Sequence, residues 1–334
     1  PRRAPRGVVP PRPGGVVVTR ADTPRPDGLV VTRAAPRRAL VLFVVVSFGL
    51  CWALAIPLWL SDDGLAAPLA GVLLPLLMLT PAAGAAVALA STRTSWRQAV
   101  RQLGLWPIRP VRRTLAWSAG GLVSAVVVVV VGVAAAAALG LLVIDLVDFS
   151  GYARSFDDLG MGELALPAGL LVGMQLLAIP LNAVVSAPFA LGEEIGWRGW
   201  LLPALTPLGT GVALVASGAV WGLWHTPIIL LGYNFDRTGA DGVVLMVGAC
   251  VAFGVLLGWL RLRTGSIWPP VFAHSAFNAT AGLSALVADA SDASDPAVTG
   301  PLGLVTTAVM VAIVVGLLLA GEMRNNRLTP IASS

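Results

Sequence analysis

The sequence predicts an all-α membrane protein, a polytopic helical bundle with about eight transmembrane helices and both termini in the cytoplasm. Of its 334 residues, 57% are hydrophobic and only 12% are charged, whereas soluble domains are about half apolar and roughly a quarter charged. Mean hydropathy is +0.84. This composition excludes a soluble enzyme, a disordered chain and a secreted disulfide scaffold. Cys51 and Cys250 both lie in apolar runs, so they provide neither a disulfide framework nor a thiolate metal cluster.

The first 38 residues differ in composition from the rest of the chain. They contain nine arginines and many prolines, which prevent a packed core, so we expect 1–38 to be a disordered cytoplasmic arm. Such an arm would contact anionic lipid head groups. We read the pI near 10.4 as a membrane topology signal, and expect no nucleic-acid partner. The domain organisation is completed by a transmembrane helical domain over 39–322 and a short cytoplasmic tail over 323–334.

Apolar segments of membrane-spanning length follow the arm, each near the ~20 residues that cross a hydrocarbon core. Because the bilayer interior has no water to satisfy backbone groups, these segments must be helices. The eight predicted segments are 39–60, 65–90, 114–144, 164–190, 211–232, 242–260, 267–288 and 302–320.

The charges between these segments orient them in the membrane. If the eight segments cross the membrane in alternating directions, 20 of the 22 arginines lie on one side and 12 of the 17 acids lie on the other. Arg198, Arg261 and Arg263 are counted among the cytoplasmic loop residues. Since basic residues stay in the cytoplasm, both termini are predicted to lie inside. The composition, which lacks lysine, is typical of GC-rich bacterial coding, so we expect a multi-pass protein of the bacterial cytoplasmic membrane.

Ionisable residues at membrane depth are expensive and need a reason. Glu194 and Arg198 are separated by four residues, so they can form an ion pair on one helix face. Glu193 lies about 100° around the helix and has no such cation, which leaves it free to act as a general base. The alternative is a solvated, inert pair of acids at a cytoplasmic helix end.

The two histidines of the chain also lie in apolar segments. His274 and Asn278 are four residues apart on one face, and His225 has Trp221 one turn before it. Each histidine alone could be a hydrogen-bonded packing residue. Two histidines, two glutamates and an asparagine in three separate segments favour a functional site.

Two further expectations concern the surroundings of these histidines. The predicted spans place His274 about 10 Å and His225 about 21 Å from the cytoplasmic helix ends, so the two would differ in depth. We interpret Trp197, Trp200 and Trp224 as interface anchors or packing residues.

The three polar clusters together resemble the motifs of the CPBP intramembrane proteases, also called the Abi or CAAX-protease family. The family pattern is Glu-Glu-x-x-x-Arg, then Phe-x-x-x-His, then His-x-x-x-Asn. Trp221 stands where the family usually has Phe, which keeps an aromatic wall. The residues that match are Glu193, Glu194, Arg198, His225, His274 and Asn278.

The resemblance implies that the protein hydrolyses peptide bonds of membrane-associated proteins or peptides. Glu193 would activate a water with help from His225, while His274 and Asn278 would stabilise the oxyanion. A zinc cofactor stays open, with Glu193, His225 and His274 as an acceptable catalytic ligand set. The family is often labelled as metalloprotease, but HExxH is absent from the sequence, and we favour a metal-independent glutamate mechanism.

Two other classes of protein compete with this interpretation. The first is a non-catalytic membrane scaffold or bacteriocin self-immunity protein of the same fold. The second is a transporter, whose intramembrane charges would line a substrate path. The polar motifs all follow residue 190, so 39–190 and 211–320 do not match as the internal repeats that transporters often contain.

Overall fold

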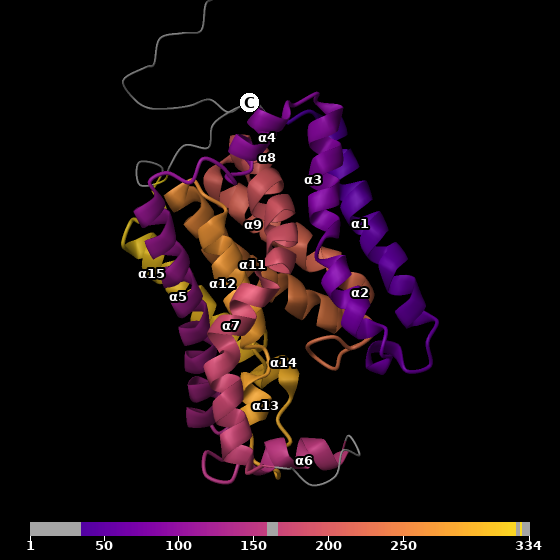
Figure 1. The fold of residues 1–334 in the computed structure, drawn as a ribbon, viewed down its shortest axis with the longest axis vertical. Helices are drawn as coiled ribbons and strands as arrows, with labels where there is room; N and C mark the ends of the chain where they lie inside the picture. The colour runs from indigo at the N-terminus through magenta and orange to yellow at the C-terminus, as the bar shows by residue number, and fades with distance from the viewer. Residues whose placement is uncertain (1–34, 159–165, 325–327, 329–334) are drawn as a thin grey trace, which may run out of the picture.

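The predicted all-α fold class is confirmed. The computed structural model describes residues 35–158, 166–324 and 328, and these residues form helices joined by turns, without any β-strand (Figure 1). The predicted arm (1–38) and tail (323–334) lie almost entirely outside the described residues and stay predictions.

Six helices of the described chain are long and apolar enough to cross a membrane. Each of the eight predicted segments contains a helix, but two of these helices are short: α9 (Thr210–Trp224) and α12 (Trp268–Ala279). The count of eight crossings and the cytoplasmic location of both termini therefore stay predictions. The six long helices are Arg37–Trp59, Ala70–Ser91, Val111–Ala138, Ala168–Leu208, Ala240–Thr264 and Pro296–Leu319.

The predicted end of the fourth segment at residue 190 is wrong. The helix continues from α7 (Ala168–Glu194) through the π-helical turn η2 (Ile195–Leu201) and reaches Leu208. Charged residues do not end it, because Arg198 pairs with Glu194 inside the bundle and is only 2% exposed. Arg198 is therefore an interior residue and not part of a cytoplasmic loop. Arg261, in α11 (Ala240–Thr264), is likewise buried.

The helices form three groups across the molecule (Figure 1). α1 (Arg37–Trp59) packs against α3 (Thr80–Ser91) on one side, and α5 (Val111–Ala138) and α15 (Leu304–Leu319) lie on the other. Between them are α7, α9, α11 and α12, with α9 packed on α11 and α12 packed on both α5 and α7. The outer faces of α1, α5, α7 and α15 expose large apolar side chains, as expected for a bundle surrounded by lipid.

Close contact between α9 and α11 depends on two glycines. A Cβ at Gly218 would lie 2.8 Å from Val251 Cα, and one at Gly222 would lie 2.5 Å from Val247 Cα. Any larger residue would separate the two backbones, so these glycines allow the helices to touch, as small residues do in membrane helix packing. The contact fixes the end of α9 that carries Trp221 and His225.

Short helices and loops close the acid-rich end of the bundle. Asp145 accepts hydrogen bonds from the backbone N–H groups of Val147, Asp148 and Ser150 just before α6 (Ser150–Asp158). These donors, Asp148 first, hold the pKa of the Asp145 carboxyl well below its usual range. Asp289 belongs to the same end, where its backbone N–H donates to the carbonyl of Val143 at 2.9 Å.

Candidate active site

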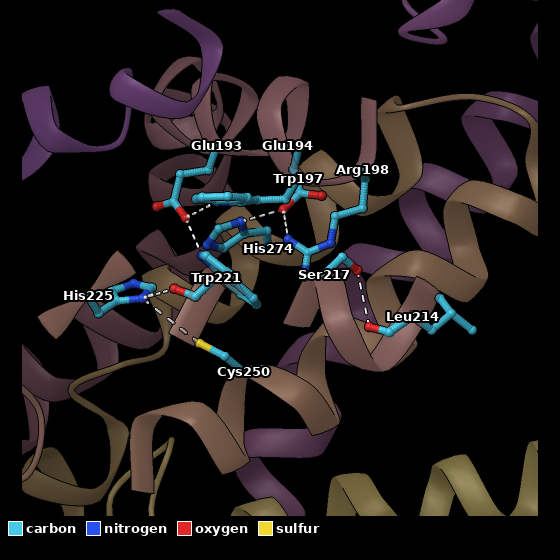
Figure 2. Close-up of polar contacts among 10 residues, drawn as sticks. All are labelled: Glu193, Glu194, Trp197, Arg198, Leu214, Ser217, Trp221, His225, Cys250 and His274. Carbon is cyan, nitrogen blue, oxygen red and sulfur yellow. Dashed lines mark hydrogen bonds and ion pairs between the residues drawn. The ribbon is translucent and has the colours of Figure 1, made fainter. Parts of the chain in front are cut away.

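Glu193 and Glu194 end helix α7 in the interior of the bundle, where both are buried. The turn that follows them, η2, is a π turn and carries Trp197 and Arg198. Turns of this kind are frequent at functional sites. Although the two glutamates are adjacent in the sequence, their carboxylates have different partners (Figure 2).

The Glu194 carboxylate contacts one guanidinium group and one imidazole ring. Arg198 Nη1 donates to Glu194 Oε1 at 2.7 Å, which confirms the predicted ion pair. The same oxygen lies 2.9 Å from His274 Nδ1. Glu194 therefore connects the first and third motifs, a contact that the spacing did not predict.

Glu193 is held by two indoles. Its Oε2 accepts a hydrogen bond from Trp221 Nε1 at 2.6 Å and another from Trp197 Nε1 at 3.3 Å. Trp197 is fully buried, which agrees with its interpretation as a packing residue, and its indole N–H is in addition a donor to Glu193. A signal for this contact was present in the sequence, because Trp197 follows Glu193 by four residues, as Arg198 follows Glu194.

His225 lies directly after the last residue of α9. Its Nδ1 is 2.9 Å from the backbone oxygen of Trp221 and 4.0 Å from Cys250 Sγ. Because a carbonyl can only accept, we infer that Nδ1 carries the proton and that Nε2 has a free lone pair. Within the described part of the chain, no hydrogen bond joins His225 to Glu193 directly.

Both histidine rings pack against Trp221, with centroid distances of 5.8 Å for His225 and 5.3 Å for His274. Both imidazoles thus lie beside one indole. α9 begins at Thr210 and α12 at Trp268, close to the predicted starts of these segments, so the expected difference in depth stays a prediction.

The motif residues fall into two sets, according to whether they line a cavity of about 640 Å³. Glu193, His225, His274 and Asn278 line it, whereas Glu194 and Arg198 do not. Asn278 is exposed, one turn after His274 on α12. The structure thus brings all six predicted residues into one region but gives only four of them access to a substrate.

Other lining residues were not predicted from the sequence. Cys250 and Tyr233 also line the cavity, as do apolar side chains of α2 (Ala70–Leu77), α7 and α11. Nothing in their sequence spacing marks them, because none of them stands at a position of the three motifs.

The proposed zinc ligands do not fit a zinc ion in this arrangement. Catalytic zinc needs three protein ligands that converge on one point. Among the described residues, no three His, Cys, Asp or Glu side chains form a group that could hold a metal ion. Instead, Nδ1 of each histidine and Oε2 of Glu193 have the separate partners described above.

Taken together, the fold and the cavity define a multi-pass membrane protein with a candidate hydrolytic site inside its helical bundle. Residues 173–280 match the family model described as Type II CAAX prenyl endopeptidase Rce1-like. The match confirms the resemblance of this segment to the CPBP, or Abi, family. All six motif residues lie within it. A comparison with curated proteins gives no match.

Proposed function

We propose that the protein is an intramembrane endopeptidase of the bacterial cytoplasmic membrane, acting on membrane-associated proteins or peptides. The observation that carries this proposal is that four of the six motif residues line the cavity and the other two do not. A carboxylate, two imidazoles and an amide line one cavity, whereas the buried Glu194–Arg198 ion pair does not line it. The family match over 173–280 supports the peptidase class.

Glu193 is the proposed general base. Both indole donors reach Oε2, and no hydrogen bond to Oε1 occurs among the described residues. Oε1 would accept a proton from a water as the water oxygen attacks the substrate carbonyl carbon, and would later deliver that proton to the leaving amine nitrogen. The free Nε2 of His225 would accept a hydrogen bond from the same water.

His274 and Asn278 are the proposed oxyanion donors. When His274 is protonated, Nδ1–H donates to Glu194 and Nε2–H is available to the oxyanion, while the Glu194 carboxylate compensates the imidazolium charge. The amide of Asn278 provides a second donor from the same helix. Fixed donors of this kind contribute most where negative charge develops.

The proposal is tested by comparing membrane proteomes of cells that contain the parent protein or the Glu193→Gln variant. We expect a substrate that stays uncut only with Glu193→Gln, and a loss of about two to four orders of magnitude in rate for the purified variant. Glu322→Gln is the matched control, since Glu322 does not line the cavity and pairs with Arg263.

Full activity in Glu193→Gln would contradict the general-base assignment. Absence of any cleavage by the parent would favour the scaffold or self-immunity alternative.

A further inference from the structure

We infer that Trp221 is a positioning residue for the proposed reaction, holding Oε2 of Glu193 so that Oε1 faces the water. This inference rests on the proposed function. Trp221 occupies the position where the family pattern has Phe, which has no donor. Here the indole N–H lies 2.6 Å from the carboxylate, and the residue is only 3% exposed.

The position of the Trp221 indole is fixed from several sides (Figure 2). The guanidinium carbon of Arg198 lies 4.2 Å from the ring centroid, and the ring meets His274 edge to face. The backbone oxygen of Trp221 contacts His225 Nδ1. A side chain with so many contacts has little rotamer freedom, so it can hold a carboxylate in one orientation.

Trp221 also connects the two glutamates. Arg198 is paired with Glu194 and lies over the indole face as a cation. A cation there draws electron density from the ring, which makes the N–H a stronger donor to Glu193. The ion pair behind the cavity thereby acts on the carboxylate inside it, and Trp221 is the group between them.

The geometry predicts a specific kinetic effect. Because both indoles donate to Oε2, they fix the carboxylate plane and leave Oε1 for the water. Loss of the shorter bond would let the carboxylate rotate, which lowers the rate of proton transfer, while Trp221→Phe keeps an aromatic ring on the cavity wall. The backbone contact to His225 is kept in any side-chain variant.

The kinetic test compares Trp221→Phe with Trp224→Phe, using the substrate that the Glu193→Gln comparison yields. Trp224 is the matched control, because it lies on the same helix, lines the same cavity and is 2% exposed. Its N–H donates to Thr80 Oγ1 at 3.1 Å instead of Glu193.

For Trp221→Phe we expect kcat to fall about ten- to a hundredfold, the typical worth of a hydrogen bond to a charged group, with KM changed less than about threefold. The pH–rate profile should change more in Trp221→Phe than in Trp224→Phe, because the Trp224 ring packs against His225 but its N–H does not donate to Glu193. Replacement of Trp221 by benzothienylalanine, which has sulfur in place of the indole N–H, should behave like Trp221→Phe although the ring size is kept. Equal losses in both Phe variants, or full activity of the benzothienyl variant, would overturn the inference.

An NMR measurement separates this inference from the proposed function. In protein labelled with ¹⁵N at tryptophan indoles, the Trp221 signal is assigned by its absence in Trp221→Phe. We expect Glu193→Gln to shift this signal and to leave the Trp224 signal in place. An active parent without that shift would overturn the role of Trp221. An inactive parent with the shift would instead overturn the proposed function. The hydrogen bond between Trp221 and Glu193 would then exist but would have no catalytic role.

Discussion

The chain uses carboxylates in two very different regions. In the interior, Glu193 and Glu194 are buried and receive hydrogen bonds from side chains: indoles, a guanidinium and an imidazole. At the acid-rich end, Asp145 and Asp289 accept hydrogen bonds mainly from backbone N–H groups and serine hydroxyls of the loops. Interior carboxylates therefore depend on buried side-chain donors, of which Trp197 and Arg198 lie one turn away and Trp221 and His274 come from other helices. The loop carboxylates depend mostly on N–H and hydroxyl groups of nearby residues, although Ser150 also donates to Asp289 from a distant part of the sequence.

This difference has an energetic consequence. A buried charge that loses its partner keeps the cost of its desolvation, whereas water compensates an exposed one. We therefore expect substitutions at the buried residues around Glu193 and Glu194 to have large effects, and substitutions in the acidic loops to have small ones.

The largest expected effect is on Glu194. Glu194→Gln would leave Arg198 buried without its anionic partner, so the free energy of unfolding should fall by about 3–5 kcal/mol. Thermal unfolding of the purified protein measures this. Glu193→Gln is the control and should lower stability much less, because its partners are neutral indoles. Equal losses in the two variants would contradict the distinction between the two glutamates.

The next effect is on catalysis. His274→Ala removes an oxyanion donor in the proposed mechanism, so kcat should fall by about two to three orders of magnitude. Ser275→Ala is the control on the same helix: Ser275 is buried, bonds to Ser186 and does not line the cavity. Similar losses in both variants would indicate damage to α12 and not the loss of a donor.

The same histidine variants test the metal question. In the glutamate mechanism, strong chelation should leave the activity of the parent unchanged. If chelation abolished activity, zinc restored it, and both His225→Ala and His274→Ala failed to retain zinc, the roles of Glu193 and the histidines would have to be rewritten as metal ligands.

A change in the close packing of α9 on α11 should have an intermediate effect on the free energy of unfolding. Gly222→Ala places a methyl group against the α11 backbone, so the free energy of unfolding should fall by about 1–3 kcal/mol. Gly211→Ala, on the same helix but with open space at its Cβ, should not lower it. Chemical or thermal unfolding of both variants is the measurement. A stable Gly222→Ala protein would show that α9 and α11 can separate without cost.

The fold class and the Glu194–Arg198 pair were predictable because they depend on local features. Hydropathy over about twenty residues marks a helix, and four-residue spacing places two side chains on one face. The end of the helical segment that begins with α7 was not predictable in this way. Charged residues normally end a membrane helix, and only the burial of Arg198 against Glu194 explains why this one continues to Leu208.

The contacts between motifs were also beyond local reasoning. Glu194 meets His274 across eighty positions, and Glu193 meets Trp221 across twenty-eight. Sequence spacing says which face of a helix a residue occupies, but not which helix that face meets. The family pattern selected residues that the structure brings into one region, while it gave no reason for Trp221 to be more than an aromatic wall.

The smallest effect is expected at the acidic loops, for Asp145→Asn. Hydrogen bonds to the carboxylate hold the pKa of Asp145 low in the folded protein, so its contribution to stability is present above the unfolded value near 4 and is lost as pH falls below it. Asparagine keeps one acceptor oxygen but places an amide where Ser150 N–H donates at 3.0 Å. The variant should therefore unfold at a slightly lower temperature than the parent near pH 7, and the two unfolding temperatures should converge between about pH 4 and about pH 2.

Asp148→Asn is the control, because Asp148 contributes its backbone N–H to this turn and that group is kept in the variant. If Asp145→Asn instead lowered stability as much as Glu194→Gln, or showed no convergence in acid, the contrast between the interior carboxylates and those of the acidic loops would be wrong.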